Sequence, residues 1–195
     1  MQRLKPTQDN IEIIDLLTGM GETWHSVKNR FPNASLTALD FSGEMMKHAE
    51  RKNRKHFSRK VSLIQQNVLD NNLPGEYFDV VICSFGLKTF NSEQIRHIAK
   101  QTKRILKNGG QFAFVEVSKP RNPILNFLYS FYLGNIIPIL GWLLLGNPRE
   151  YRMLWKYTSE FENALKAYEI FRSEGLTTTF ESYFFGCASG FHGMK

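Results

Sequence analysis

Short apolar runs alternate with amphipathic stretches along the first two-thirds of the chain. Five runs are rich in β-branched or other large apolar residues and have the length of strands. They cover residues 11–17, 35–40, 61–66, 78–84 and 112–117. Helical spacing of apolar positions predicts helices at residues 22–31, 42–54 and 93–106. Strands separated by helices predict a doubly wound, mostly parallel α/β sheet with its ligand crevice at the carboxyl ends of the strands.

The second half of the chain predicts the remaining elements. Asn108-Gly109-Gly110 follows the third helix and is expected to end it. Residues 122–148 contain no charged residue, and residues 151–167 are amphipathic, which predicts a helix. Residues 177–192 alternate β-branched and aromatic positions around Gly186 and predict an antiparallel hairpin. We therefore expect one domain over residues 1–195, in which residues 120–170 form a helical insertion that covers the crevice.

Composition narrows the class of partner and compartment. The net charge of +7 favours anionic partners without choosing among nucleic acid, acidic lipid and anionic metabolites. The basic run at residues 51–60 is interpreted as a solvated helix end, and no nucleic-acid partner is expected because no RNA-binding module accompanies it. Cys83 and Cys187 are too few for a disulfide framework or a zinc site, so we expect no metal and a reducing, cytoplasmic location.

Candidate binding residues follow the first strand. Asp15 ends that strand, and Thr18, Gly19, Met20 and Gly21 form the turn before the next helix. Glycines at such a turn let the backbone approach a ligand closely. The same pattern also serves tight packing of a strand against a helix, so the turn alone does not establish a nucleotide site.

Polar residues follow the second and third strands as well. Asp40 ends the second strand about 20 residues beyond the glycines, the spacing of an acidic residue that binds a ribose diol. Its alternative role is a carboxylate before a helix N-terminus. Asn67 and the backbone of Val68 offer hydrogen bonds to an adenine edge, although asparagine also favours plain turns. Nicotinamide, flavin and S-adenosylmethionine (SAM) all stay open here, and the glycine spacing disfavours NAD.

The fourth strand brings Ser84, Phe85 and Lys88 to the lip of the crevice, with Gly86 permitting a close bend. Together the motifs resemble those of the ubiquinone/menaquinone biosynthesis C-methyltransferase family along nearly the whole chain. The resemblance rests on residues 15–21, Asp40, and residues 66–68, 84–88, 106–110, 116–120, 137–141, 151–154 and 191–193. It implies a class I SAM-methyltransferase fold with a seven-stranded sheet. It also implies C-methylation of the ring of a polyprenyl quinol, either demethylmenaquinol or the ubiquinone-pathway benzoquinol.

The resemblance also implies roles for individual residues. The cofactor residues it implies are Asp15, Thr18, Gly19, Met20, Gly21, Asp40, Phe41, Asn67, Val68 and Ser84. Gly19 and Gly21 would line the methionine end of SAM, Asp40 would hold its ribose, and Ser84 would lie beneath the transferred methyl. Lys88 is the catalytic candidate, with the hypothesis that it stabilises a developing phenolate on the quinol. The alternative is that Lys88 is a solvated surface residue.

Some positions depart from the family pattern. Leu17 stands where the family has a small residue, Met20 where it often has Thr, and Lys88 where it has Arg. The family carries further residues before its first strand, so we expect either a missing N-terminal segment or a more open site. Two other functions therefore stay open. One is methylation of another small lipophilic acceptor, and the other is a non-catalytic SAM-fold binding module.

The apolar stretch at residues 124–145 is long enough to span a bilayer, but asparagines, a proline and glycines interrupt it. We expect a lid that buries the polyprenyl tail and touches the inner face of the membrane peripherally, with a core-covering helix pair or a true span as alternatives. Basic residues flank the stretch and suit anionic headgroups: Lys119, Arg121, Arg149, Arg152 and Lys156. The expected partner is a lipophilic quinol, and the oligomeric state is left open, with a homodimer included.

Overall fold

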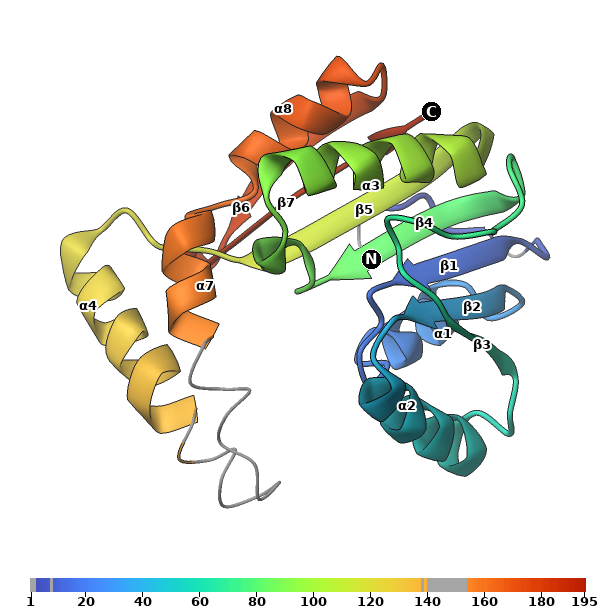
Figure 1. The fold of residues 1–195 in the computed structure, drawn as a ribbon, viewed down its shortest axis with the longest axis horizontal. Coiled ribbons are helices and arrows are strands. Elements are labelled where there is room, and N and C mark those ends of the chain that lie inside the picture. The colour runs from blue at the N-terminus through green and yellow to red at the C-terminus, as the bar shows by residue number, and fades with distance from the viewer. Residues whose placement is uncertain (1–2, 8, 138, 140–153) are drawn as a thin grey trace.

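The computed structural model describes residues 3–7, 9–137, 139 and 154–195. Seven strands form one sheet in the order β3-β2-β1-β4-β5-β7-β6. β7 runs antiparallel to both of its neighbours, and the other pairings are parallel (Figure 1). This topology confirms the mostly parallel, seven-stranded α/β sheet predicted from the sequence.

The elements follow the predicted alternation. The first half contains β1 (Glu12–Leu16), α1 (Trp24–Arg30), β2 (Ser35–Asp40), α2 (Gly43–His56), β3 (Val61–Gln65), β4 (Phe78–Ser84), the 3-10 turn η1 (Leu87–Thr89), α3 (Ser92–Ile105) and β5 (Leu106–Val117). The second half contains α4 (Pro123–Phe131), the π-helical turn η2 (Tyr132–Ile136), α7 (Leu154–Phe161), α8 (Leu165–Ser173), β6 (Thr177–Tyr183), the short turn η3 (Phe184–Gly186) and β7 (Ala188–Met194). The last two strands form the predicted hairpin.

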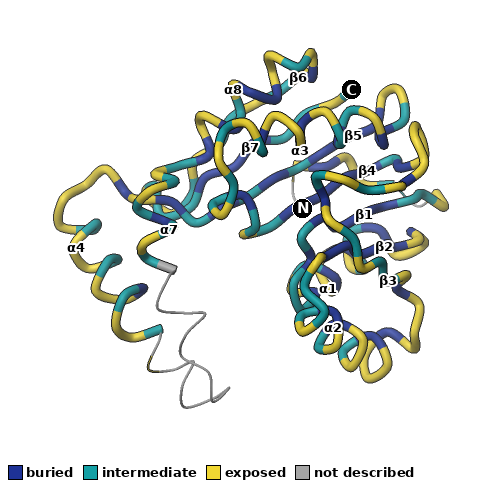
Figure 2. The backbone as a smooth tube through the Cα atoms, in the orientation of Figure 1, coloured by how far each residue is buried: buried dark blue, intermediate teal, exposed yellow. Residues whose placement is uncertain are grey.

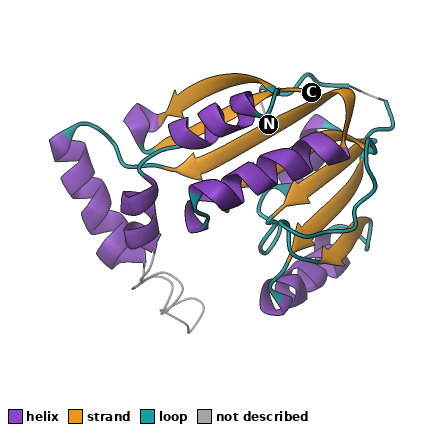
Figure 3. Cartoon of the chain, turned by 45° about the horizontal axis from the view of Figure 1, so that its top comes forward, coloured by secondary structure: helices purple, strands orange, loops and turns teal. Residues whose placement is uncertain are grey.

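Helices cover both faces of the sheet (Figure 3). On one face, α3 and α8 pack against apolar residues of the central strands, around Phe112, Phe114, Phe171 and Phe191. The rings of Phe114 and Phe191 stack with their centroids 5.3 Å apart. On the other face, Trp24 from α1 packs with Phe57, which follows α2. Because the central strands are buried on both faces, they show as continuous apolar runs in the sequence.

Two local predictions are wrong. α3 ends at Ile105, and β5 begins directly at Leu106, so Asn108–Gly110 lies within β5 instead of ending the helix. The register of β5 against β4 shifts at this point, and Gly109 N donates to the carbonyl of Lys195. The glycines therefore form an irregularity of the strand that the C-terminus covers.

The single helix predicted for residues 151–167 is also wrong where the structure describes it, because α7 and α8 are separate. Glu162 adopts a φ of +59° after α7, and Ala164 N donates to Ser189 Oγ at 2.8 Å. This buried hydroxyl from β7 takes a backbone N–H that a continuous helix would use itself. Residues 151–153 lie outside the described residues.

α4 and α7 extend beyond the carboxyl end of β5, whereas α8 packs in the main core (Figure 1). No residue of α4 is buried (Figure 2). Across the described part of the chain, no helix is both long enough and apolar enough to cross a bilayer. Most of the second half of the apolar stretch, residues 138 and 140–145, lies outside the described residues.

The close approach of β7 to β6 requires a glycine at position 193. A Cβ on Gly193 would lie 1.7 Å from the carbonyl oxygen of Thr177. We expect Gly193→Ala to lower the free energy of unfolding by about 2 kcal/mol or more, because a backbone carbonyl in the sheet cannot move aside. Urea denaturation measures this. The control is Gly134→Ala, where the nearest atom is 3.9 Å away. Equal stability of the two variants would contradict the close approach.

Candidate functional site

The carboxyl ends of β1, β2, β3 and β4 meet at one edge of the sheet. β1 lies between β2 and β4, with Leu16 opposite both Leu39 and Cys83. Backbone hydrogen bonds extend this alignment past the strands, from Thr18 N to the carbonyl of Leu39 at 3.0 Å and from Gln66 N to the carbonyl of Asp40 at 3.1 Å. The turns that carry the candidate residues are therefore neighbours in space.

The turn after β1 contains three residues with left-handed backbone, which alternate with ordinary ones. Leu17, Gly19 and Gly21 have φ values of +56°, +56° and +80°. A Cβ on Gly21 would lie 2.5 Å from the ring of Trp24. Gly21 is thus required for packing against the start of α1, which is the alternative that the sequence left open for this turn.

Asp40 ties the first two turns together. Its Oδ2 accepts a hydrogen bond from Gly19 N at 2.9 Å, and its Oδ1 accepts one from Ser42 N at 2.9 Å. Ser42 also caps α2, since its hydroxyl accepts from Met45 N. The carboxylate is buried, and each oxygen keeps lone pairs for a further donor. Asp40 thus lies before the N-terminus of α2, as the alternative role describes, and its binding of a ribose diol stays a prediction.

Asp15 lies beneath this turn in a fully buried position. Its Oδ2 accepts hydrogen bonds from the hydroxyls of Thr18 at 2.6 Å and Thr23 at 2.5 Å. Trp24 Nε1 in turn donates to Thr18 Oγ1 at 2.9 Å. Within the described structure, Asp15 Oδ1 is buried without a hydrogen-bond partner. Burial raises the pKa of Asp15 to about 6, against the lowering effect of the two threonine hydroxyls.

The other candidate residues surround this edge at different depths. Asn67 is exposed, and its Oδ1 accepts from Leu69 N at 3.0 Å within a tight turn. Val68 is buried in the core, whereas Phe41 beside Asp40 has 67% of its surface exposed. Met20 in the glycine turn is half-buried. Because Asn67 Oδ1 accepts a hydrogen bond within its own turn, the amide hydrogens of Asn67 are the groups left to contact a ligand.

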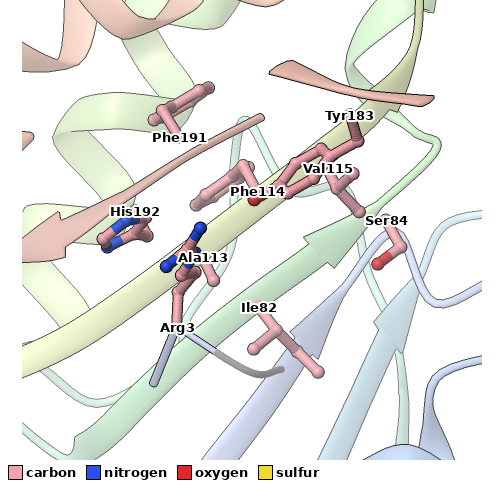
Figure 4. Close-up of a pocket in the computed structure, with 9 residues that line it drawn as sticks. All are labelled: Arg3, Ile82, Ser84, Ala113, Phe114, Val115, Tyr183, Phe191 and His192. Carbon is pink, nitrogen blue, oxygen red and sulfur yellow. The ribbon is translucent and has the colours of Figure 1, made fainter. Parts of the chain in front are cut away.

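Ser84 at the end of β4 lines a small hollow of about 70 Å³ on the sheet face opposite α3. Figure 4 shows Ser84 and Val115 at one side of this hollow and Arg3 and His192 at the other. Tyr183 from β6 also lines the hollow. His192 Nε2 lies 3.7 Å from Glu181 Oε1. The hollow is thus lined by residues of β4, β5, β6 and β7 together with Arg3 from the N-terminal segment.

Lys88 is buried in an ion pair, so the interpretation of a solvated surface lysine is wrong. Its Nζ lies 3.0 Å from Glu116 Oε1, and the two side chains are 9% and 0% exposed. Glu116 also accepts hydrogen bonds from Lys88 N at 3.1 Å and Val117 N at 2.9 Å. Burial raises the pKa of Glu116, and Lys88 opposes this rise. The pair holds one cation at the carboxyl ends of β4 and β5.

Glu116 is the site residue that the sequence analysis missed. It was part of a family motif but received no role of its own. The available signal was an acidic residue at a buried position of a strand in which buried and half-buried residues alternate. A fully buried carboxylate requires a partner. The pattern alone could not show that this partner is Lys88, 28 residues earlier in the chain.

Leu17 occupies space between the loops after β1 and β4. A Cβ on Gly86 would lie 2.7 Å from Leu17 Cδ1, so the glycine makes room for the leucine side chain. Leu17 also holds a left-handed φ that glycine adopts without strain. Leu17, which replaces the small residue of the family pattern, is therefore accommodated by the absence of a side chain at Gly86.

Comparisons with known proteins agree with the fold and the family predicted from the sequence. The profile of the ubiE/COQ5 methyltransferase family matches residues 1–195. The demethylmenaquinone methyltransferase of Alkalihalophilus pseudofirmus is 34% identical over 143 residues, covering 73% of this chain and 60% of that protein. That of Lactococcus lactis is 30% identical over 166 residues, covering 85% and 65%. The chain thus spans less than two-thirds of the length of these two relatives.

Solved structures share the architecture. A SAM-dependent methyltransferase from Aquifex aeolicus is 16% identical, with a TM-score of 0.67, and the match covers 96% of this chain and 84% of that one. Phosphoethanolamine N-methyltransferase 2 of Haemonchus contortus, solved with S-adenosyl-L-methionine, is 15% identical with a TM-score of 0.65, over 93% and 37%. At these identities the likeness shows the fold alone, and this fold is the class I methyltransferase fold predicted from the sequence.

The buried Asp15 makes stability depend on pH. Its pKa is about 6 in the folded protein against 3.8 for an ordinary aspartate, so the folded state holds the proton more tightly. The contribution of Asp15 to the free energy of unfolding is therefore full below pH 3.8 and falls as pH rises to about 6. We expect a loss on the order of 3 kcal/mol, at about 1.4 kcal/mol for each pH unit over which the two states differ in protonation.

The measurement is urea denaturation of the wild type and Asp15→Asn from pH 3.5 to 7.5. The wild type should lose this stability as pH rises and Asp15→Asn should not, because the amide does not titrate. Asp70→Asn removes a carboxylate from an exposed position and serves as the control. If Asp15→Asn has the same pH slope as the wild type, the raised pKa of Asp15 is refuted.

Proposed function

The chain belongs to the ubiE/COQ5 methyltransferase family, and we propose that it is a SAM-dependent C-methyltransferase acting on the ring of a polyprenyl quinol. The observation that carries the proposal is the contact of Asp40 with Gly19 at the carboxyl edge of the sheet. This contact brings together the acidic residue and the glycine turn that the family pattern assigns to one cofactor. The names of the demethylmenaquinone methyltransferase relatives support demethylmenaquinol as the acceptor.

The residues at this edge fit a bound SAM. Asp40 has free lone pairs for the ribose hydroxyls, and the exposed Asn67 has amide hydrogens for the adenine. Asp15 has an unpartnered buried oxygen, and a nearby cationic ligand would favour its ionised form. Phe41, Met20 and Ser84 border the same edge. These acceptors and the Asn67 amide thus suit a nucleoside with an attached cationic group.

SAM supplies an electrophilic methyl on a sulfonium, so the chain itself must orient the acceptor ring and favour its electron-rich form. A quinol becomes electron-rich as a hydroxyl begins to lose its proton. Lys88 is held at the carboxyl ends of β4 and β5 by Glu116, where its ammonium would stabilise a developing phenolate. Because both members of the pair are buried, the charge of Lys88 acts in a weakly screened environment.

The proposal includes a lipophilic tail and a peripheral contact with the inner face of the membrane. The apolar and largely exposed α4 supports both, since it offers uncovered apolar surface next to the predicted crevice. The alternatives are another small lipophilic acceptor and a non-catalytic SAM-binding module. Methylation of demethylmenaquinol separates the first alternative from the proposal, and any methyl transfer excludes the second.

Asp40→Asn tests the cofactor site. We expect the dissociation constant for SAM to rise about tenfold to a hundredfold, because a charged acceptor for the ribose is replaced by a neutral one. Isothermal titration calorimetry measures this, with Asp70→Asn as the matched control. An unchanged dissociation constant for Asp40→Asn contradicts the assignment of Asp40, and absence of SAM binding by the wild type refutes the cofactor itself.

Lys88→Met tests the catalytic role. We expect turnover of demethylmenaquinol to fall about a hundredfold or more, with SAM affinity unchanged, because the charge on the developing phenolate is no longer balanced. The variant also leaves Glu116 unpaired, which destabilises the fold. The double variant Lys88→Met with Glu116→Gln removes both charges and separates the two effects.

The control for Lys88→Met is Lys100→Met on the exposed side of α3. Lys88→Arg keeps the charge and should retain part of the turnover. Wild-type turnover in the folded double variant would exclude Lys88 from the reaction.

A further inference from the structure

The tip of the β6–β7 hairpin exposes two adjacent phenylalanines. Phe184 and Phe185 are 78% and 91% exposed, the two highest values among the large apolar residues that the structure describes. Their φ values are +49° and +56°, in the left-handed region that bulky residues rarely adopt. The backbone is thus strained at the point where two aromatic side chains stand in water. Neither the core nor the site at the sheet edge uses them.

The tip lies beside the start of α4. Ser118 N donates to the carbonyl of Cys187 at 2.9 Å, and a Cβ on Gly186 would lie 3.4 Å from Pro120 Cα. The hydroxyl of Tyr129 on α4 donates to the same carbonyl at 3.1 Å. The hairpin tip and α4 are therefore joined at the end of the sheet from which α4 extends in Figure 1.

α4 contributes more apolar surface at this end. Its large apolar side chains with more than half of their surface exposed are Ile124, Phe127, Leu128 and Phe131. No charged residue occurs between positions 122 and 148. Together with Phe184 and Phe185, these side chains form what we call the apolar end. Exposed apolar surface of this kind marks an interaction site.

Two exposed cations border the apolar end, and the carbonyl oxygen of the exposed Glu162 accepts a hydrogen bond from the backbone N–H of one of them, Lys119, at 2.7 Å. Lys119 and Arg121 are exposed, and with Phe185 they line a cleft of about 310 Å³. The other residues that line the cleft carry no acidic group. Neither Lys119 nor Arg121 forms a salt bridge with a described residue. Two cations without acidic partners next to aromatic side chains match the boundary between the headgroups and the acyl chains of an anionic bilayer.

We propose that the apolar end docks on anionic phospholipid, with Phe184 and Phe185 inserted below the headgroups and Lys119 and Arg121 against the lipid phosphates. A second copy of the chain fits this surface less well, because its own Lys119 and Arg121 would approach like charges in a symmetric pair. The inference deepens the proposed membrane contact and names the segment that makes it. It does not depend on methyl transfer.

Vesicle flotation of the full chain tests the proposal. The vesicles contain phosphatidylcholine alone or phosphatidylcholine with phosphatidylglycerol, at low salt. We expect the wild type to bind the anionic vesicles. The double variant Phe184→Ser with Phe185→Ser should lower the partition coefficient at least about tenfold, because the two aromatic rings that insert into the bilayer are lost. Its control is Tyr77→Ser, which removes an exposed aromatic at the opposite edge of the sheet, where β4 begins.

A second pair of variants tests the charges. Arg121→Ser should weaken binding to anionic vesicles and leave binding to phosphatidylcholine unchanged. The control is Arg51→Ser, which removes an exposed arginine of α2 that is remote from the apolar end. Equal binding by the wild type and the phenylalanine double variant overturns the assignment of the tip, although the chain would still be a membrane binder. No binding by the wild type overturns the membrane contact as well.

Two further measurements distinguish membrane docking from self-association of the chain and from the quinol activity. A wild-type dimer that the phenylalanine double variant dissociates, seen by light scattering without lipid, would assign the tip to a second copy and overturn the proposal. Methylation of a short-tailed, water-soluble quinol should be the same in the wild type and the double variant. Failure of this reaction in both proteins would refute the quinol activity and leave the vesicle result intact.

Discussion

The pairing of β1 between β2 and β4 is the constraint on which the rest of the structure depends. Parallel strands point their carboxyl ends the same way, so the turns after these strands lie side by side. The hydrogen bond from Gly19 N to Asp40 then fixes the distance between the first two turns. Because this bond joins a backbone group to a buried carboxylate, it holds only if both strands keep their register. The site therefore depends on the sheet more than on any single side chain.

The buried charges at this edge are balanced unevenly. Glu116 is neutralised by Lys88, and Asp40 receives two backbone N–H groups. Asp15 receives two hydroxyls and forms no salt bridge with a residue that the structure describes, and its burial raises its pKa to about 6. A cationic ligand at the edge would supply the missing balance and shift Asp15 towards its ionised form. A carboxylate in such a position either loses its charge by taking up a proton below about pH 6 or keeps it beside a cation.

β1, β2 and β4 could be predicted from the sequence because strands buried on both faces leave continuous apolar runs. The Asp15 turn and Asp40 were predictable because each follows such a run. The break between α7 and α8 was not, since it depends on the hydroxyl of Ser189, which comes 25 residues after Ala164. The pairing of Lys88 with Glu116 also required the register of β4 against β5. What sequence patterns missed are contacts between elements distant along the chain.

The ion pair of Lys88 with Glu116 and the apolar end lie at the same end of the sheet. β4 and β5 end at Lys88 and Glu116, and β5 leads directly into α4 and its neighbour, the hairpin tip. α7 packs against η1, the turn that contains Lys88, and against η2, which continues α4. An acceptor with a polar ring and an apolar tail would therefore meet the buried cation and the apolar surface without crossing the sheet. α7 thus links the apolar α4–η2 segment to η1, the turn that carries Lys88, while Glu116 of β5 holds the side chain of Lys88.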